Sequence, residues 1–179
     1  MAGIFTACTF REVGSAATPQ NIASIENIDG TKLVYVRKIV VQCDMTVALA
    51  TVTPVIRVSR ATGVPIGGTT LSKGSFDTTT TANVNTIVRG QTASDGGALS
   101  GPTATAGDTL WQTFLMRVHT AVGQILMFDS EIVPILAMNT GKELILRQNQ
   151  ALLVQIVAAA GGSNAATNHY IVSIVWEEN

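Results

Sequence analysis

The chain has 179 residues, of which 11 are Lys or Arg and 12 are Asp or Glu, and its formal net charge is -1. This balance, with no run of basic residues, provides no attraction for phosphate backbones and argues against direct nucleic-acid binding. No stretch reaches the roughly 20 apolar residues that a membrane-spanning helix needs, so no membrane partner is expected.

Charged residues make up only 13% of the chain, whereas soluble domains typically contain about 25%. Val, Ile and Thr account for 57 residues, and these β-branched side chains fit a pleated sheet better than a helix. Thr, Ala, Gly, Asn and Gln replace many of the usual Lys and Glu residues. This composition predicts a surface that neighbouring subunits can cover at low desolvation cost, with a neutral monomer as the alternative interpretation.

The first 20 residues are predicted to form an N-terminal docking arm. They alternate poorly between apolar and polar positions, carry Phe5, Phe10 and Arg11, and end in a turn-rich stretch. We expect these three side chains to contact a partner surface, and residues 21–179 to form one domain. The segment lacks the basic region and long apolar core of a signal peptide, so synthesis and folding in a cytoplasm are expected.

Beyond residue 20, short apolar runs recur between turn signals such as Asp29-Gly30, which predicts a series of strands. The predicted strands are 22–28, 33–43, 55–59, 85–89, 110–119, 125–128, 143–147, 151–159 and 169–176. Residues 72–100 form the longest loop-like region. Residues 132–138 fit either a strand or a helical turn, because their periodicity does not distinguish the two.

The last predicted strand has the clearest alternation, with one shared face formed by Tyr170, Val172, Ile174 and Trp176. Many short strands, frequent turns and the lack of an amphipathic helical pattern favour an all-β fold. We expect a jelly-roll-like antiparallel β-sandwich.

Residue patterns for catalysis and metal binding are missing from the sequence. His119 and His169 have no acidic or cysteine neighbours at ligand spacing, and Cys8 and Cys43 fit no zinc or redox spacing. No nucleophile elbow or phosphate-binding loop occurs. We therefore expect a protein that is not an enzyme and that has no catalytic residues, no cofactor and no metal site.

Three aromatic residues offer an alternative binding function. Trp111, Tyr170 and Trp176 could form a platform on which a sugar stacks, as aromatic side chains on sheets can do. Their placement at strand period makes packing in the core the favoured interpretation.

Four blocks of sequence resemble a family of small virion proteins of tailed bacteriophages. They are residues 33–42 (LVYVRKIVVQ), 89–97 (RGQTASDGG), 116–124 (MRVHTAVGQ) and 165–170 (AATNHY). The resemblance extends over most of residues 22–176 and includes no catalytic motif.

The resemblance implies a capsid decoration, or cement, protein. Such a protein is expected to be a jelly-roll homo-oligomer, with a trimer favoured, that binds the major capsid protein on the outer surface of the virion and stabilises the shell. The arm with Phe5, Phe10 and Arg11 would then dock on the capsid or on a neighbouring subunit. The alternatives are another capsid, tail or fibre-base subunit, or a carbohydrate-binding β-sandwich used for host attachment.

Overall fold

Strands make up all the regular secondary structure in the part of the chain that the structure describes. The computed structural model describes residues 3–10, 12–15, 19–44, 55–92, 101–114, 125–128, 143–157 and 167–179. Within these ranges the strands are β1 (Gly3–Cys8), β2 (Glu12–Ser15), β3 (Gln20–Asn27), β4 (Val34–Asp44), β5 (Val55–Ala61), β6 (Thr69–Thr70), β7 (Gly74–Ser75), β8 (Thr86–Gly90), β9 (Ala106–Phe114), β10 (Ile125–Phe128), β11 (Leu144–Leu146), β12 (Gln150–Val157) and β13 (Thr167–Glu178).

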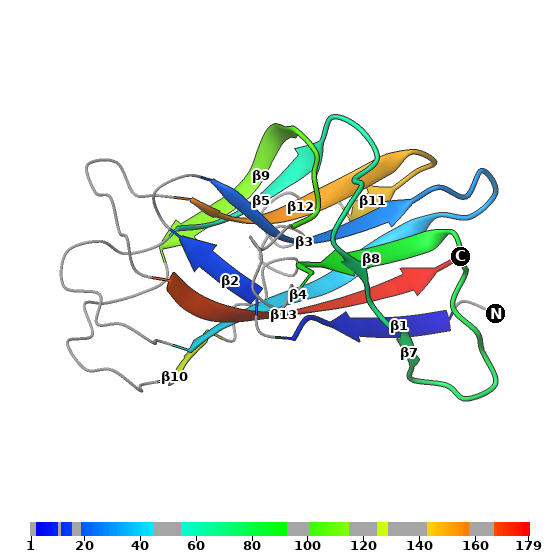
Figure 1. The fold of residues 1–179 in the computed structure, drawn as a ribbon. Coiled ribbons are helices and arrows are strands. Elements are labelled where there is room, and N and C mark those ends of the chain that lie inside the picture. Colours follow the sequence, from blue (N-terminus) through cyan, green and yellow to red (C-terminus); the bar gives the residue numbers. More distant parts are fainter. Residues whose placement is uncertain are drawn as a thin grey trace.

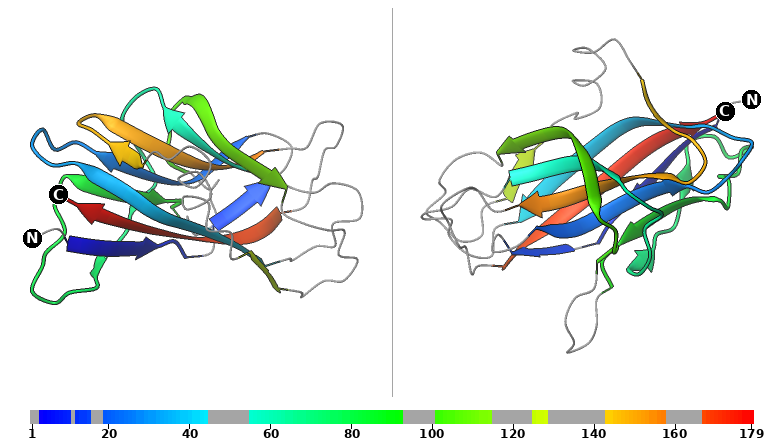
Figure 2. Two further views of the ribbon diagram at one scale, coloured as in Figure 1. Left: turned by 180° about the vertical axis from the view of Figure 1, so that it is seen from behind. Right: turned by 90° about the horizontal axis from the view of Figure 1, so that it is seen from above.

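The strands form two antiparallel sheets that pack as a β-sandwich (Figures 1 and 2). The seven-stranded sheet has the order β10-β4-β13-β1-β7, with β11 also paired to β4 and β2 paired to β13. The six-stranded sheet has the order β6-β8-β3-β12-β5-β9. The chain crosses repeatedly between the layers, because β1, β4, β10 and β13 belong to the first sheet and β3, β5, β9 and β12 to the second. The predicted all-β antiparallel sandwich is confirmed.

The core lies between the two sheets and is formed by alternate side chains of each strand. On β13 the side chains of the predicted face are all buried, and they are Tyr170, Val172, Ile174 and Trp176. Their neighbours in sequence are only partly buried. The alternation that defined this strand in the sequence therefore identifies the core face correctly.

The central strands of the six-stranded sheet are buried on both faces. This applies to β3 from Ile22 to Asn27 and to β12 from Ala151 to Val157. The long connection between β5 and β9 packs against these strands, and the Asn21 side-chain amide donates a hydrogen bond to the Pro102 carbonyl oxygen at 2.7 Å. A strand covered on both faces needs no polar side, which accounts for the nearly continuous apolar run of β12.

Most of the predicted strands occur within a few residues of their expected bounds. β9 begins at Ala106 rather than at residue 110. Register shifts near Ser59 of β5 allow residues 106–109, which show less alternation, to pair with β5. The predicted loop region also contains β7, which has two residues and is therefore too short to show a periodicity. Residues 115–119 and 132–138 lie outside the described residues.

The N-terminal segment departs from the prediction of a separate arm. Gly3–Cys8 forms β1, which pairs along its length with β13, the last strand of the chain, and also with β7. Phe5 lies in the core, 2% exposed, so the expected docking role of this side chain is wrong. The alternation of buried and exposed residues is present in β1, but the sequence obscures it because the outward residues include the apolar Ile4 and the small Cys8.

Candidate interaction surface

The described residues hold no group of three or more His, Cys, Asp or Glu residues that could bind a metal ion. His169 lies on β13 and His119 is outside the described residues, so the structure does not bring the two histidines together. Cys8 is exposed, Cys43 is buried, and neither forms a disulfide. No helix in the described ranges is long and apolar enough to cross a membrane.

Two large apolar side chains are exposed side by side at the edge of the seven-stranded sheet. Ile4 is 46% exposed and Phe76 is 67% exposed. The Phe76 amide donates a hydrogen bond to the Ile4 carbonyl oxygen at 3.1 Å, so the two residues are backbone neighbours across the β1–β7 pair. We call Ile4 and Phe76 the edge patch. Clustered apolar side chains at a surface are typical of sites that bind another protein.

The loop that carries Phe76 is fixed by partly buried polar contacts rather than by apolar packing alone. Glu178, at the end of β13, accepts a hydrogen bond from the Asn83 amide at 2.7 Å. The Lys73 ammonium donates to the carbonyl oxygens of Asn83 at 2.5 Å and Thr86 at 3.0 Å. Hydrogen bonds to charged groups are each worth about 1.5–3 kcal/mol. The loop is thus ordered before any partner binds.

Asp29, in the connection between β3 and β4, anchors the same loop from the other side. One carboxylate oxygen accepts from the side-chain amides of Asn83 at 2.7 Å and Asn85 at 3.2 Å. The other oxygen accepts from the amide and the hydroxyl of Thr31, each at 2.7 Å. The hydrogen bonds from Asn83 and Thr31 hold the pKa of the Asp29 carboxyl below its usual range. The Asp29 anchor is therefore charged at neutral pH.

Lys73 and Glu178 form the electrostatic centre of this region. Burial lowers the pKa of the Lys73 ammonium, and the nearby Glu178 carboxylate opposes that shift. Glu178 is itself buried and also accepts a hydrogen bond from the Trp176 indole at 2.9 Å. Both carboxylate oxygens of Glu178 accept hydrogen bonds, one from the loop and one from the core. Glu178 therefore connects the core to the loop rather than presenting a reactive group.

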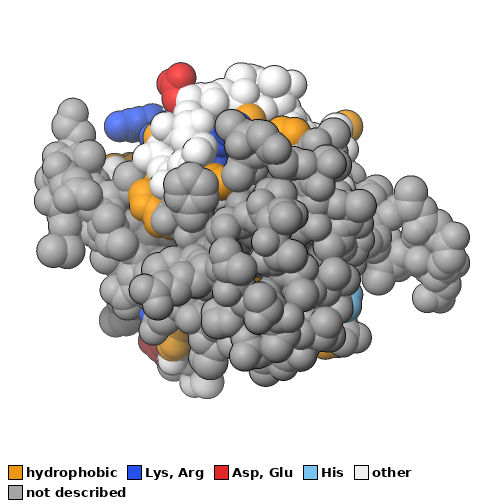
Figure 3. Space-filling model, turned by 90° about the vertical axis from the view of Figure 1, so that its left-hand side faces the viewer, with side chains coloured by type: hydrophobic (Ala, Val, Ile, Leu, Met, Phe, Trp, Pro, Cys, Tyr) orange, Lys and Arg blue, Asp and Glu red, His pale blue; other side chains and the backbone are white. Residues whose placement is uncertain are grey.

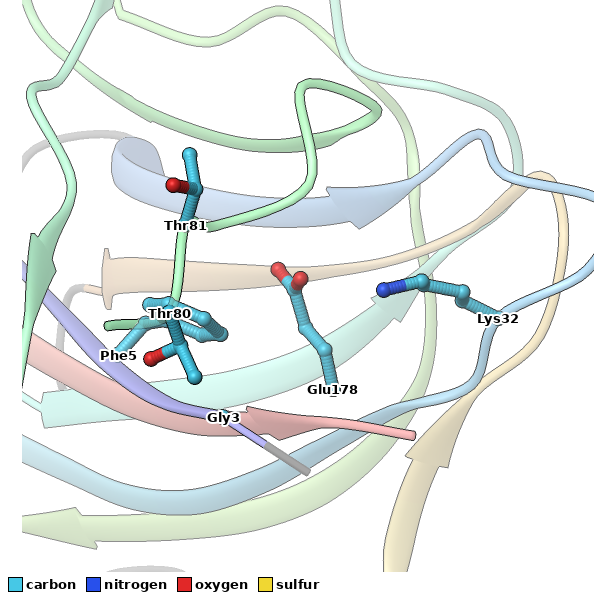
Figure 4. A pocket seen from close by; sticks show the side chains of 6 residues that line it. All are labelled: Gly3, Phe5, Lys32, Thr80, Thr81 and Glu178. Carbon is cyan, nitrogen blue, oxygen red and sulfur yellow. The ribbon is translucent and has the colours of Figure 1, made fainter. Parts of the chain in front are cut away.

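A pocket of about 140 Å³ lies under the loop (Figure 4). It is lined by Gly3, Phe5, Lys32, Thr80, Thr81 and Glu178. Figure 4 shows the Lys32 side chain pointing toward Glu178. Sites for small organic ligands usually measure about 300–1,000 Å³. This pocket is too small for such a ligand, so the edge patch is the stronger candidate site.

The outer face of the seven-stranded sheet is largely neutral. Its middle is formed mostly by partly exposed or exposed, uncharged side chains, namely Thr6, Cys8, Val40, Gln42, Ile171, Ser173 and Val175, and Lys38 pairs with Val175. At one end Arg37 forms ion pairs with Glu143 and Glu177, at 2.5 Å each. Figure 3 views the end of the sandwich away from the two termini, where acidic and basic side chains lie near hydrophobic ones among the described residues.

The predicted docking residues do not form one site. Phe5 is in the core, Phe10 is 88% exposed just after β1, and Arg11 lies outside the described residues. Sequence reasoning missed Ile4 and Phe76. A signal for Phe76 was present, since it is a lone aromatic residue in a loop-like region rich in Gly, Ser and Thr, where no core packing requires it.

The three aromatic residues of the sugar-platform alternative do not share an exposed face. Trp176 and Tyr170 are fully buried, which confirms core packing for both, and Trp111 is partly buried against the core. A stacking platform made of these three residues is therefore excluded.

The described residues define an all-β sandwich protein with an exposed apolar edge patch. Comparisons with protein-family models, with curated proteins and with solved structures find no match to the chain.

Proposed function

We propose that the chain is a structural protein of a tailed-phage virion, namely a decoration protein that binds the outer capsid surface as a homotrimer and stabilises the shell. The resemblance of four sequence blocks to small virion proteins motivates this proposal. The strand order, the neutral surface and the edge patch support it independently.

The strand order is compatible with a jelly roll. The sets β1-β13-β4-β10 and β3-β12-β5-β9 form two four-stranded sheets between which the chain alternates, as in a double-sheet jelly roll. In this interpretation β6, β7 and β8 are additions within the connection from β5 to β9. Jelly rolls occur in viral capsid proteins and in lectins, so the fold supports a capsid function without identifying it.

The edge patch is the observation that carries the proposed assembly. Phe76 is held outward by a loop whose anchors are Asp29, Lys73 and Glu178, so little conformational entropy is lost when a partner covers it. Exposed apolar area that is already ordered binds more tightly than the same area on a disordered loop. We assign the edge patch to the contact between copies of the chain.

The low charge fits symmetric assembly. In a closed homo-oligomer each interface uses the same residues in every copy, so like charges near the symmetry axis repel. Near the edge patch, the β7 loop carries two charged residues: the Lys73 ammonium donates to the Asn83 carbonyl oxygen, and the Asp77 carboxylate accepts hydrogen bonds from the amide and hydroxyl of Thr79. Many identical weak contacts repeated over a shell then give strong binding through multivalency.

Phe10 is assigned to the contact with the major capsid protein. It is the most exposed large apolar side chain of the described residues, and it directly follows the part of the N-terminal segment that is built into the sheet. The rigid β1 strand therefore fixes the position of Phe10 relative to the edge patch.

The test measures oligomer mass and capsid binding on separate variants. Light scattering should give the mass of three chains for the unchanged protein and of one chain for Phe76→Ser. Phe10→Ser should remain trimeric but bind at least about tenfold less to purified capsids of the major capsid protein. Val64→Ser, at an exposed apolar residue in the connection between β5 and β6, is the control and should change neither measurement.

Electron microscopy of labelled virions then locates the protein. Label spread over the head is the expected result. Label confined to the tail or the fibre base would replace the decoration assignment with one of the other virion subunits. A protein that is monomeric at all concentrations and absent from particles would overturn the proposal altogether.

A further inference from the structure

Glu12 is a buried carboxyl group at the boundary between the two sheets. It begins β2, which pairs with β13 of the seven-stranded sheet, and it lies opposite Tyr170. The residue is only 2% exposed. Buried carboxyl groups normally face a cation or several hydrogen-bond donors, because an isolated charge is costly away from water.

The carboxyl group reaches across to the six-stranded sheet. One oxygen accepts a hydrogen bond from the Gln91 amide at 2.7 Å, directly after β8 ends. The other oxygen rests on the backbone of Gly90, where an added Cβ would lie 2.5 Å from it. The Glu12 carboxyl group therefore packs directly against the end of β8. Gly90 permits this contact because it has no Cβ.

The charged and titratable side chains on the strands around Glu12 do not supply a cation to it. On β13 they are His169, Tyr170, Glu177 and Glu178, on β3 Glu26, and on β8 Arg89. Arg89 pairs with Glu26 at 3.0 Å. β12 has no charged residue. Burial raises the pKa of Glu12 to about 7, and the hydrogen bond from Gln91 only partly opposes this shift.

We infer that Glu12 is a proton-dependent latch that holds β2 of the seven-stranded sheet to the end of β8 in the six-stranded sheet. The neutral carboxyl group is compatible with the buried, closed contact. The ionised group favours an open arrangement in which water reaches it. Phe10 lies two residues before Glu12, so the latch also controls how firmly this exposed side chain is positioned.

The sign follows from proton linkage. The open form has an ordinary glutamate pKa of about 4.5 and the closed form one of about 7, so the closed form binds more protons between these values. Closure is therefore fully favoured in acid and weakens as the pH rises through 7. Between pH 6 and 8.5 the closed-to-open ratio should fall about tenfold.

Amide hydrogen exchange on the full chain, corrected for intrinsic exchange rates, tests this directly. Protection of the Gln91 amide should fall about tenfold from pH 6 to 8.5 in the unchanged protein. Glu12→Gln, which stays neutral, should show the same protection at both pH values. Glu178→Gln, at a buried carboxylate whose two oxygens are both hydrogen-bonded, is the matched control and should keep the original pH response.

A protection factor at Gln91 that does not change with pH, or one that falls equally in Glu12→Gln, would overturn the inference. A ¹³C titration of the Glu12 carboxyl in the unchanged protein provides a second measurement that needs no variant. A midpoint near pH 7 supports the latch, whereas a midpoint below about pH 5 contradicts it. Neither measurement depends on capsid binding, so the latch and the proposed function can fail separately.

Discussion

The rings of Phe5 and Trp176 pack together in the core, with centroids 6.0 Å apart and planes inclined at 36°. The two residues are also direct partners in the pairing of β1 with β13, so the first and last strands of the chain meet at this contact. Tilted aromatic pairs of this kind add about 0.5–1.5 kcal/mol beyond the area they bury. This pair adds a side-chain contact to the backbone pairing of the two strands.

Phe5 and Phe10 provide a matched comparison of a buried and an exposed phenylalanine. Phe5→Ala should lower the unfolding free energy by about 3–5 kcal/mol, because it leaves a cavity beside Trp176. Phe10→Ala should change it by less than about 0.5 kcal/mol, since the side chain is 88% exposed. Urea denaturation at one protein concentration measures both. Equal effects would mean that the N-terminal segment does not pack as β1 in solution.

Two arginine residues should differ sharply in their contribution to stability. Arg89→Ala leaves Glu26, which is fully buried, without its ion-pair partner, and should cost about 3–5 kcal/mol. Arg37→Ala removes partly exposed ion pairs with Glu143 and Glu177 and should cost less than about 1 kcal/mol. Denaturation at low and high salt provides the measurement, and only the smaller effect should depend on salt.

The Arg89→Ala penalty should also depend on pH. Burial raises the pKa of Glu26, while the Arg89 cation and its hydrogen bond lower it. Without Arg89 the pKa rises further, so Glu26 becomes neutral at a higher pH and the buried charge disappears. The penalty should therefore shrink as the pH falls below neutral. A penalty that is constant from pH 8 to pH 4 would show that Glu26 is not buried as a charge.

Asp29→Ala should loosen the loop that presents Phe76, because it removes the acceptor for Asn83, Asn85 and Thr31. The lowered pKa of Asp29 means that its contribution to stability is complete above about pH 4 and is lost as the pH falls further. Exchange rates of the 74–85 amides should thus rise in acid in the unchanged protein. In the variant they should be raised already at pH 6, and a variant with unchanged exchange would refute the anchoring role.

Gly68 and Gly63 test the packing of the connection between β5 and β9. Gly68 has a φ of 67°, and an added Cβ would lie 2.3 Å from the Gly90 carbonyl oxygen. Gly68→Ala should therefore destabilise the fold by more than about 1 kcal/mol. Gly63→Ala meets no atom within 4 Å and should be neutral or slightly stabilising. Thermal unfolding of the two variants separates strain at one position from the general effect of replacing glycine.

Much of the strand pattern could be predicted from local sequence. The alternation of Tyr170, Val172, Ile174 and Trp176 correctly identified both β13 and its buried face. The apolar run of β12 and the turn at Gln148-Asn149 also marked real elements, and Asn149 has the positive φ of 60° that such a turn requires. These features are readable because period, turn chemistry and β-branched composition are properties of a few neighbouring residues.

The candidate surface and the latch could not be predicted in the same way. Glu12 and Glu26 are acidic residues of the kind usually found in solvent, and nothing next to them in the sequence indicates burial. β7 has only two residues, and it forms because Phe5 and Thr6 of β1 pair with it at the edge of the sheet. The position of Phe76 beside Ile4 follows from that pairing, which joins residues about 70 positions apart in the chain.

By itself the sequence determined that the protein is built of strands, where most of them lie, and which face of the last strand is buried. The tertiary structure alone decided that the first strand pairs with the last, that Phe5 is in the core while Phe10 is not, and that Glu12 rests on Gly90. The reason is physical. Strand formation depends on local side-chain preferences, whereas pairing, burial and the ionisation of carboxyl groups depend on contacts between residues that are distant in sequence.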